Sequence, residues 1–149
     1  MEKKLTFEQL CPSIHYDIQG IYRSEKYYPY DPEAIIVNFH GQYRDGSAGD
    51  DDAKFMRGIN MMTLDMWSGI PIVVDITDLA YEWWDRIDYW FPFSVYEIPQ
   101  AREKVITAVI VWDKNRKALS SLYNTIDIVD NKRFFDSRES VCKKLKIPL

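Results

Sequence analysis

The strongest restriction on the fold of this chain comes from three short, almost wholly apolar runs. They cover residues 34–39, 70–76 and 105–112, and Val and Ile dominate them. Runs of this length and composition are typical of strands that are buried on both faces of a sheet. Parallel sheets with helices on both faces contain such strands. The chain is therefore predicted to belong to the α/β class.

Helical patterns lie between these runs. Asp50 is a candidate N-cap for a helix that ends near Gly69, a candidate left-handed C-cap. The apolar residues of this helix recur at helical spacing: Phe55, Ile59, Met62 and Met66. A strand, a helix and a second strand form a βαβ unit, whose right-handed crossover makes the two strands parallel.

Three further helices are predicted. The first covers residues 78–90, with apolar residues on one half of the helical wheel and acidic residues on the other, and Pro92 ends it. The second begins at Asp113 and runs to Tyr123. The third begins at Asp136, with Glu139 at the spacing of a capping box.

The other segments are assigned to strands at the edges. Residues 5–7 and 14–18 are rich in β-branched and aromatic side chains, and 126–129 is a short apolar run. At 149 residues the chain has the length of one domain. We therefore expect a single domain over 1–149: a layered α/β sandwich with a mixed, centrally parallel sheet, antiparallel N-terminal strands and helices on both faces.

The charge is divided along the chain. Residues 1–100 hold 17 acids and 8 Lys or Arg, whereas residues 101–149 hold 6 acids and 11 Lys or Arg. The overall net charge is −4 and the pI about 5.2, which argues against direct nucleic-acid binding. Two interpretations stay open: ordinary solvated faces that attract each other, or an acidic patch that steers a basic partner.

Localisation follows from what the sequence lacks. No apolar run approaches the ~18–20 residues of a membrane span, and the first residues lack a secretory apolar region. Two cysteines, Cys11 and Cys142, are too few for a disulfide framework. We expect a cytoplasmic protein that does not enter the membrane.

The leading functional hypothesis concerns the acidic, aromatic segment after the second apolar run. Its charged members are Asp78, Glu82, Asp85 and Asp88, and its aromatic members are Tyr89, Trp90, Phe91 and Phe93. Charges of one sign speed an encounter, and aromatic anchors hold the complex. This pattern predicts a non-enzymatic domain that binds a basic protein. One concrete form is an immunity or antitoxin-type inhibitor of a nuclease toxin, whose carboxylates mimic phosphates.

The same segment has a purely structural alternative. If its aromatic side chains belong to the core, its acidic side chains only form the solvated face of a helix. A ligand or substrate would then bind where parallel strands end, at His40, Asp75 and Asp78. A histidine oriented by an aspartate suits proton transfer, although the chain has no G-x-S-x-G motif or phosphate loop.

No cofactor or metal is predicted. The loop 45–52 offers carboxylates but lacks the spacing of a calcium loop, and two histidines with isolated cysteines do not suggest zinc. The partner's identity, any substrate and the oligomeric state, a homo-oligomer included, stay open.

The segment 34–90 resembles small α/β units of crotonase-like and STAS-like domains, in which an apolar strand, a helix and a strand of the form IVVDIT precede a further helix. The terminal FFDSRESVCKKL resembles the closing helix of STAS-like domains. This resemblance covers about half the chain and implies a regulatory module as a third function. Residues 78–81 replace the Gly-rich helix start of crotonases, and Thr77 stands near the serine of phosphorylated STAS domains. No catalytic or regulatory residue is therefore carried over.

Overall fold

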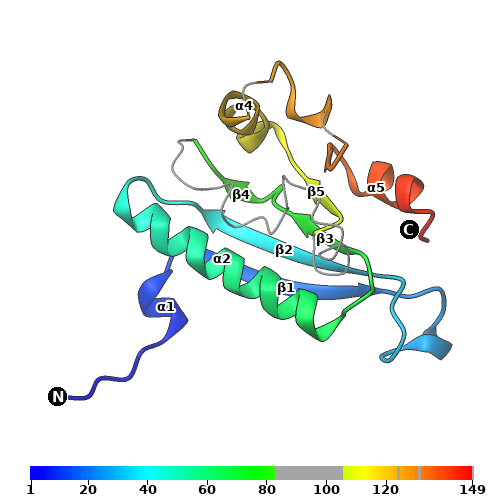
Figure 1. The fold of residues 1–149 in the computed structure, drawn as a ribbon, viewed down its shortest axis with the longest axis horizontal. Coiled ribbons are helices and arrows are strands. Elements are labelled where there is room, and N and C mark those ends of the chain that lie inside the picture. The colour runs from blue at the N-terminus through cyan, green and yellow to red at the C-terminus, as the bar shows by residue number, and fades with distance from the viewer. Residues whose placement is uncertain (83–105, 124, 131, 149) are drawn as a thin grey trace.

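A mixed sheet of six strands forms the centre of the fold (Figure 1). The computed structural model describes residues 1–82, 106–123, 125–130 and 132–148. Five strands pair in one row: β1 (Ile14–Ile21), β2 (Ala34–Gln42), β3 (Ile72–Asp75), β5 (Ala108–Ile110) and β6 (Phe134–Phe135). The sixth, β4 (Leu79–Ala80), pairs with β2 beyond the end of β3.

The strand directions confirm the predicted mixed sheet. β1 is antiparallel to β2, with Ile14 opposite Gly41 and Ile21 opposite Ala34. The pairs β2–β3, β3–β5 and β5–β6 are all parallel. A turn that contains the 3₁₀ helix η1 (Glu25–Tyr27) joins β1 to β2. The predicted parallel centre and antiparallel N-terminal edge are both correct.

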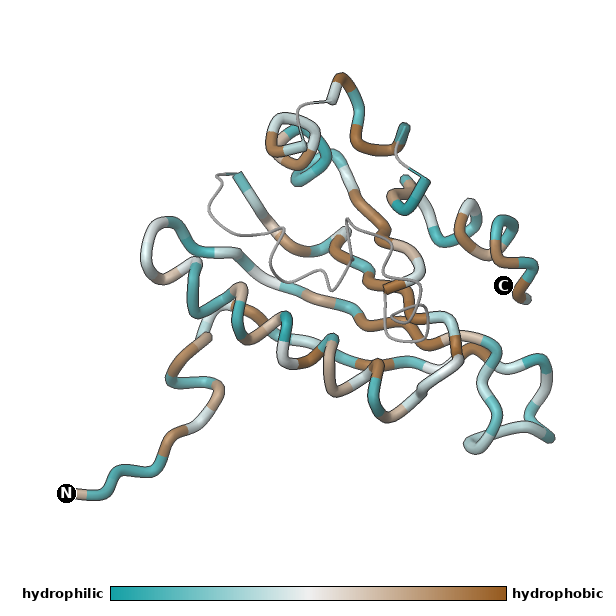
Figure 2. The backbone as a smooth tube through the Cα atoms, viewed as in Figure 1, coloured by the Kyte–Doolittle hydropathy of each residue, from teal (hydrophilic) through white to brown (hydrophobic). Residues whose placement is uncertain are grey.

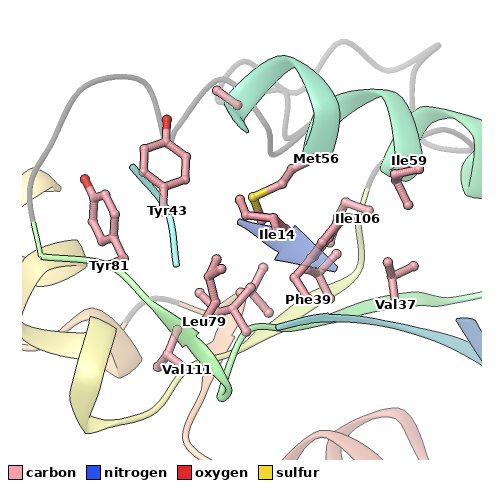
Figure 3. Close-up of a cluster of buried hydrophobic side chains, with 14 of the residues drawn as sticks. Ile14, Val37, Phe39, Tyr43, Met56, Ile59, Leu79, Tyr81, Ile106 and Val111 are labelled. Carbon is pink, nitrogen blue, oxygen red and sulfur yellow. The ribbon is translucent and has the colours of Figure 1, made fainter. Parts of the chain in front are cut away.

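Helix α2 (Ser47–Met66) covers one face of the sheet and encloses the larger core (Figure 1). Successive side chains of a strand point to opposite faces, so Val37 and Phe39 of β2 meet Met56 and Ile59 of α2 (Figure 3). Helix α4 (Asp113–Leu122) adds Leu119 to the same cluster. The most hydrophobic stretches accordingly lie in the middle of the sheet (Figure 2).

Helix α5 (Arg138–Leu145) packs on the opposite face. Its Val141 contacts a cluster made by the alternate strand residues Ile36, Val73, Ala108 and Ile110. Helices therefore lie on both faces, as predicted. Closer to the carboxyl ends of β2 and β3, this face carries polar residues in place of apolar ones: Asn38, His40 and Asp75.

Several predicted boundaries differ from the structure. α2 begins at Ser47, three residues before Asp50, and Gly69 (φ 84°) lies in the turn after the helix rather than at its C-cap, Trp67. α5 is capped by Ser137, whose hydroxyl accepts from the Ser140 N–H, and not by Asp136 with Glu139. Hydroxyl caps are favoured because they satisfy a backbone donor that the helix leaves open.

Two strand predictions are wrong. Residues 5–7 do not form a strand, because the Thr6 N–H donates to the Gln9 side chain and starts the short helix α1 (Phe7–Leu10). Residues 126–129 do not form a strand either, because the 3₁₀ helix η3 (Ile128–Asp130) overlaps them. There the Ile128 N–H donates to the Ser120 hydroxyl and the Val129 N–H to the Asp127 carboxylate, so neither is available to a strand.

The helix predicted from Asp78 is wrong where the structure describes it, because Leu79 and Ala80 form β4. They pair with Gly41 and Gln42, which extends the parallel sheet past β3. Asn115 of α4 fixes this path, since its side-chain N–H groups donate to the carbonyls of Ile76 (2.6 Å) and Leu79 (3.0 Å). The rest of the predicted helix, residues 83–90, lies outside the described residues.

An ion pair with a fully buried carboxylate holds the start of α2 against the N-terminal segment. The fully buried Asp52 accepts from the Arg44 side chain at 2.6 Å, and Arg44 also donates to the Leu10 carbonyl at 2.8 Å. The Cys11 thiol donates to Asp52 at 2.9 Å. Burial is the main reason that the pKa of Cys11 rises to about 12. Cys11 and Cys142 are both free and buried, which makes Cys11 a structural residue.

Candidate functional site

A polar pocket of about 230 Å³ lies where β2 and β3 end, on the face that carries α5. Five parts of the chain supply its polar side chains: β1, β2, the end of β3, the turn between β3 and β4, and the start of α5. These side chains are Asp17, Gln19, Asn38, His40, Asp75, Thr77, Asp78 and Arg138. Parallel strands place their carboxyl ends at one edge of the sheet, so residues distant in sequence meet here.

The floor of the pocket is a closed hydrogen-bonded set. Asn38 and Asp75 are buried, and Arg138 links them by donating to Asn38 Oδ1 (2.6 Å) and Asp75 Oδ2 (3.1 Å). The other oxygen of Asp75 accepts from the backbone N–H and the hydroxyl of Thr77. Because the buried carboxylate has donors on both oxygens, it is held in one orientation.

One wall of the pocket is fixed by the register of the hairpin. Asp17 lies opposite Asn38, and side chains opposite each other in an antiparallel pair point to the same face. Asp17 accepts from Asn38 Nδ2 and from His40 Nε2, both at 2.7 Å. The bond from His40 is the main reason that the pKa of Asp17 lies below its usual value.

The mouth of the pocket is formed by His40 and the exposed Asp78. An ionised carboxylate only accepts hydrogen bonds, so the bond to Asp17 places the proton of a neutral His40 on Nε2. Nδ1 is then an acceptor, and it faces Asp78 Oδ2 at 3.7 Å. Among the described residues, no other side chain bonds to either group. With His40 in its neutral form, two acceptors therefore face each other across the mouth.

The pocket carries an excess of negative charge. Three carboxylates line it against one guanidinium, and that guanidinium is engaged with Asp75 on the floor. In the described ranges, no group of three or more His, Cys, Asp or Glu side chains is placed to hold a metal ion. The arrangement suits a cationic hydrogen-bond donor better than an anion.

No family model matches the chain. Neither a curated protein nor a solved structure matches it at a significant level. The described helices include none that is both long and apolar enough to cross a membrane.

The structure brings together the three residues of the predicted strand-end site, His40, Asp75 and Asp78, in one pocket. It adds others that the sequence analysis missed, among them Asp17, Asn38 and Arg138. The alternation of Asn38 and His40 along β2 could have placed both on one face. No sequence signal links Arg138 to residues 63 and 100 positions away.

The predicted acidic helix face is only partly described. Asp78 and Glu82 are exposed, but Asp78 lies in the turn before β4 and Glu82 follows β4. Glu82 lines a different pocket beside Lys114 and Lys117. The proximity of Glu82 to these two lysines favours the interpretation in which acidic and basic faces of the domain attract each other. The remaining members lie outside the described residues: Asp85, Asp88, Tyr89, Trp90, Phe91 and Phe93.

The contacts of Asp17 predict a pH-dependent contribution to stability. Because folding lowers the pKa of Asp17, the contribution is complete above the unfolded value of about 3.9 and is lost as the pH falls through the folded value. We expect the difference in unfolding free energy between the native chain and Asp17→Asn to shrink from about pH 4.5 to about pH 2.5. Urea unfolding at a series of pH values measures it, and a constant difference would contradict the assignment.

Proposed function

We propose that the protein is a non-enzymatic binding domain that recognises a basic protein at the carboxyl edge of β2 and β3. The observation that carries the proposal is the pocket's excess of carboxylates beside the exposed Asp78. Complementary charge accelerates association and selects the partner by sign. An immunity or antitoxin-type inhibitor of a basic toxin, a nuclease toxin included, is one concrete form of this function.

The fixed geometry of the pocket supports recognition. Asp17 and Asp75 each accept hydrogen bonds on both carboxylate oxygens, so a partner does not have to order them. Groups that are already ordered lose little conformational entropy when a complex forms. A preorganised, negatively charged pocket is therefore suited to hold a positively charged group of a partner.

A STAS-like regulatory module is a second candidate for the biological role. The observation that favours it is the C-terminal segment, where β6 and α5 follow each other and α5 closes the second face of the sheet. Such a module would also work by binding a protein, so it shares the binding site and the experiment proposed below. The two roles differ in what the bound partner does.

A small enzyme is the alternative from a different class. The contact between Asp17 and His40 favours it, since a carboxylate that orients a histidine is a common arrangement for a general base. His40 Nδ1, however, faces a second carboxylate, Asp78, in place of a group that it could activate. The binding function explains the exposed Asp78, whereas the enzyme does not.

The test is affinity capture at low salt from the cells that make the protein, with matched charge variants as bait. Asp78→Asn removes a carboxylate at the pocket, and Asp45→Asn removes one from an exposed site that does not line it. We expect the native chain and Asp45→Asn to retain the same basic protein. Capture by Asp78→Asn should fall at least severalfold, since a charged hydrogen bond contributes about 1.5–3 kcal/mol. Equal capture by all three baits would overturn the proposal.

A further inference from the structure

We infer that the pocket receives a single basic side chain of the partner, whose N–H groups donate to His40 Nδ1 and Asp78 Oδ2 together. This inference rests on the proposed function and names the chemical group that the site recognises. It follows from three independent properties of the pocket: the facing acceptors at its mouth, its volume and its net charge.

The two acceptors at the mouth define the position of the donor. His40 Nδ1 and Asp78 Oδ2 are 3.7 Å apart, too far for a hydrogen bond to each other. A nitrogen that lies about 2.9 Å from both would donate to each at normal hydrogen-bond distance. An ammonium or guanidinium group has at least two N–H donors and no acceptor, so it satisfies both acceptors without repulsion.

The volume limits the size of the occupant. Pockets for drug-sized ligands and cofactors measure about 300–1,000 Å³, and this pocket has about 230 Å³. The buried pair Asn38 and Asp75, already bonded to Arg138, closes its floor. A single side chain fits this space, whereas a nucleotide does not. The occupant therefore enters from the mouth and ends above Arg138.

The charges around the pocket disfavour an anionic occupant. Asp17 from β1 and Asp78 from the turn after β3 flank His40, and Asp75 lies deeper with Arg138 from α5. Arg138 is the lining residue with a permanent positive charge, and its guanidinium is already paired with Asp75 and bonded to Asn38. A carboxylate or phosphate at the mouth would face the negative charges of Asp78 and Asp17.

The same geometry makes a proton the competitor of the occupant. A proton on His40 Nδ1 would itself point at Asp78, which removes one acceptor and adds a positive charge to the mouth. The groups that face His40 are Asp17 and Asp78, and His15 lies opposite it in the hairpin register. Protonation of His40 and binding of a basic side chain should therefore exclude each other, and affinity should fall as the pH is lowered.

The experiment uses the full chain with isotope-labelled histidine rings, observed by NMR. The probes are n-butylammonium and n-butylguanidinium chloride, which carry the end groups of Lys and Arg, and sodium acetate at equal ionic strength is the control. We expect one or both cations to shift the His40 ring signals in a saturable way, and to shift them more than the signals of the neighbouring His15. The cation with the higher affinity identifies the recognised side chain. Acetate should have no effect.

Asp78→Asn should weaken cation binding roughly tenfold or more, and Asp45→Asn should leave it unchanged. Binding should also weaken at a pH where the same spectra show His40 protonated. No saturable shift, or an equal shift in Asp78→Asn, would overturn the inference. If the probes fail while capture of the partner still depends on Asp78, this inference falls and the proposed function stands. If neither cation binding nor capture of the partner depends on Asp78, both this inference and the proposed function are overturned.

Discussion

Replacing Arg44 with alanine is expected to lower the free energy of unfolding by about 3–5 kcal/mol. Arg44 is the charge partner of Asp52, whose side chain has no exposed surface. Removing one member of a buried ion pair leaves the other charge in the interior without compensation, and that is far more costly than losing both. The backbone N–H of Arg44 and the Cys11 thiol would still donate to Asp52, but neither carries a charge.

The matched control for Arg44→Ala is Lys54→Ala. Lys54 lies 3.8 Å from Asp51, one turn along α2, and both side chains are at least half exposed. Exposed pairs of this kind contribute less than about 1 kcal/mol, so urea unfolding should show a small change for Lys54→Ala. A loss below about 1 kcal/mol for Arg44→Ala would show that the buried pair does not stabilise the start of α2 as described.

Replacing Asn115 with alanine should cost about 3 kcal/mol, because the side chain connects three backbone groups. It donates to the carbonyls of Ile76 and Leu79 and accepts from the Trp112 N–H. Asn115, Ile76 and Leu79 have no exposed surface, so the two carbonyls would lose a partner without gaining water. An unsatisfied buried group costs about 1–3 kcal/mol.

Ser121→Ala is the control for Asn115→Ala, since Ser121 is an exposed residue of the same helix. It should change stability by less than about 0.5 kcal/mol. Hydrogen exchange gives a second measurement: the amides of β4 and of Tyr43, which donates to the Ala80 carbonyl, should exchange faster in Asn115→Ala. Unchanged exchange together with unchanged stability would contradict the role given to Asn115.

The strands of the core were the most predictable part of the fold. β2, β3 and β5 are buried on both faces, and this environment selects continuous Val and Ile, which the apolar runs show. β4 was not predictable in the same way. Leu79 and Ala80 suit the apolar half of the predicted helix as well as a strand, and Asn115, 36 residues after Leu79, decides between the two.

The candidate site was predictable to the extent that strand ends define it. His40 follows the first apolar run and Asp75 lies near the end of the second, and the rule that parallel strands end at one edge brings them together. Asp17 depends on the register of β1 against β2, which sequence patterns fix poorly. Arg138 depends on how α5 packs on the second face, a contact between segments far apart in the chain.

We propose that carboxylates at the ends of β2 and β3 attract a basic partner. The association rate of the captured protein with the native chain and with Asp78→Asn at increasing salt tests this proposal. We expect slower association for the variant at about 0.01 M salt, where the Debye length is about 30 Å. The difference should nearly vanish at about 1 M, where that length is about 3 Å. Equal association rates at low salt would contradict the proposal.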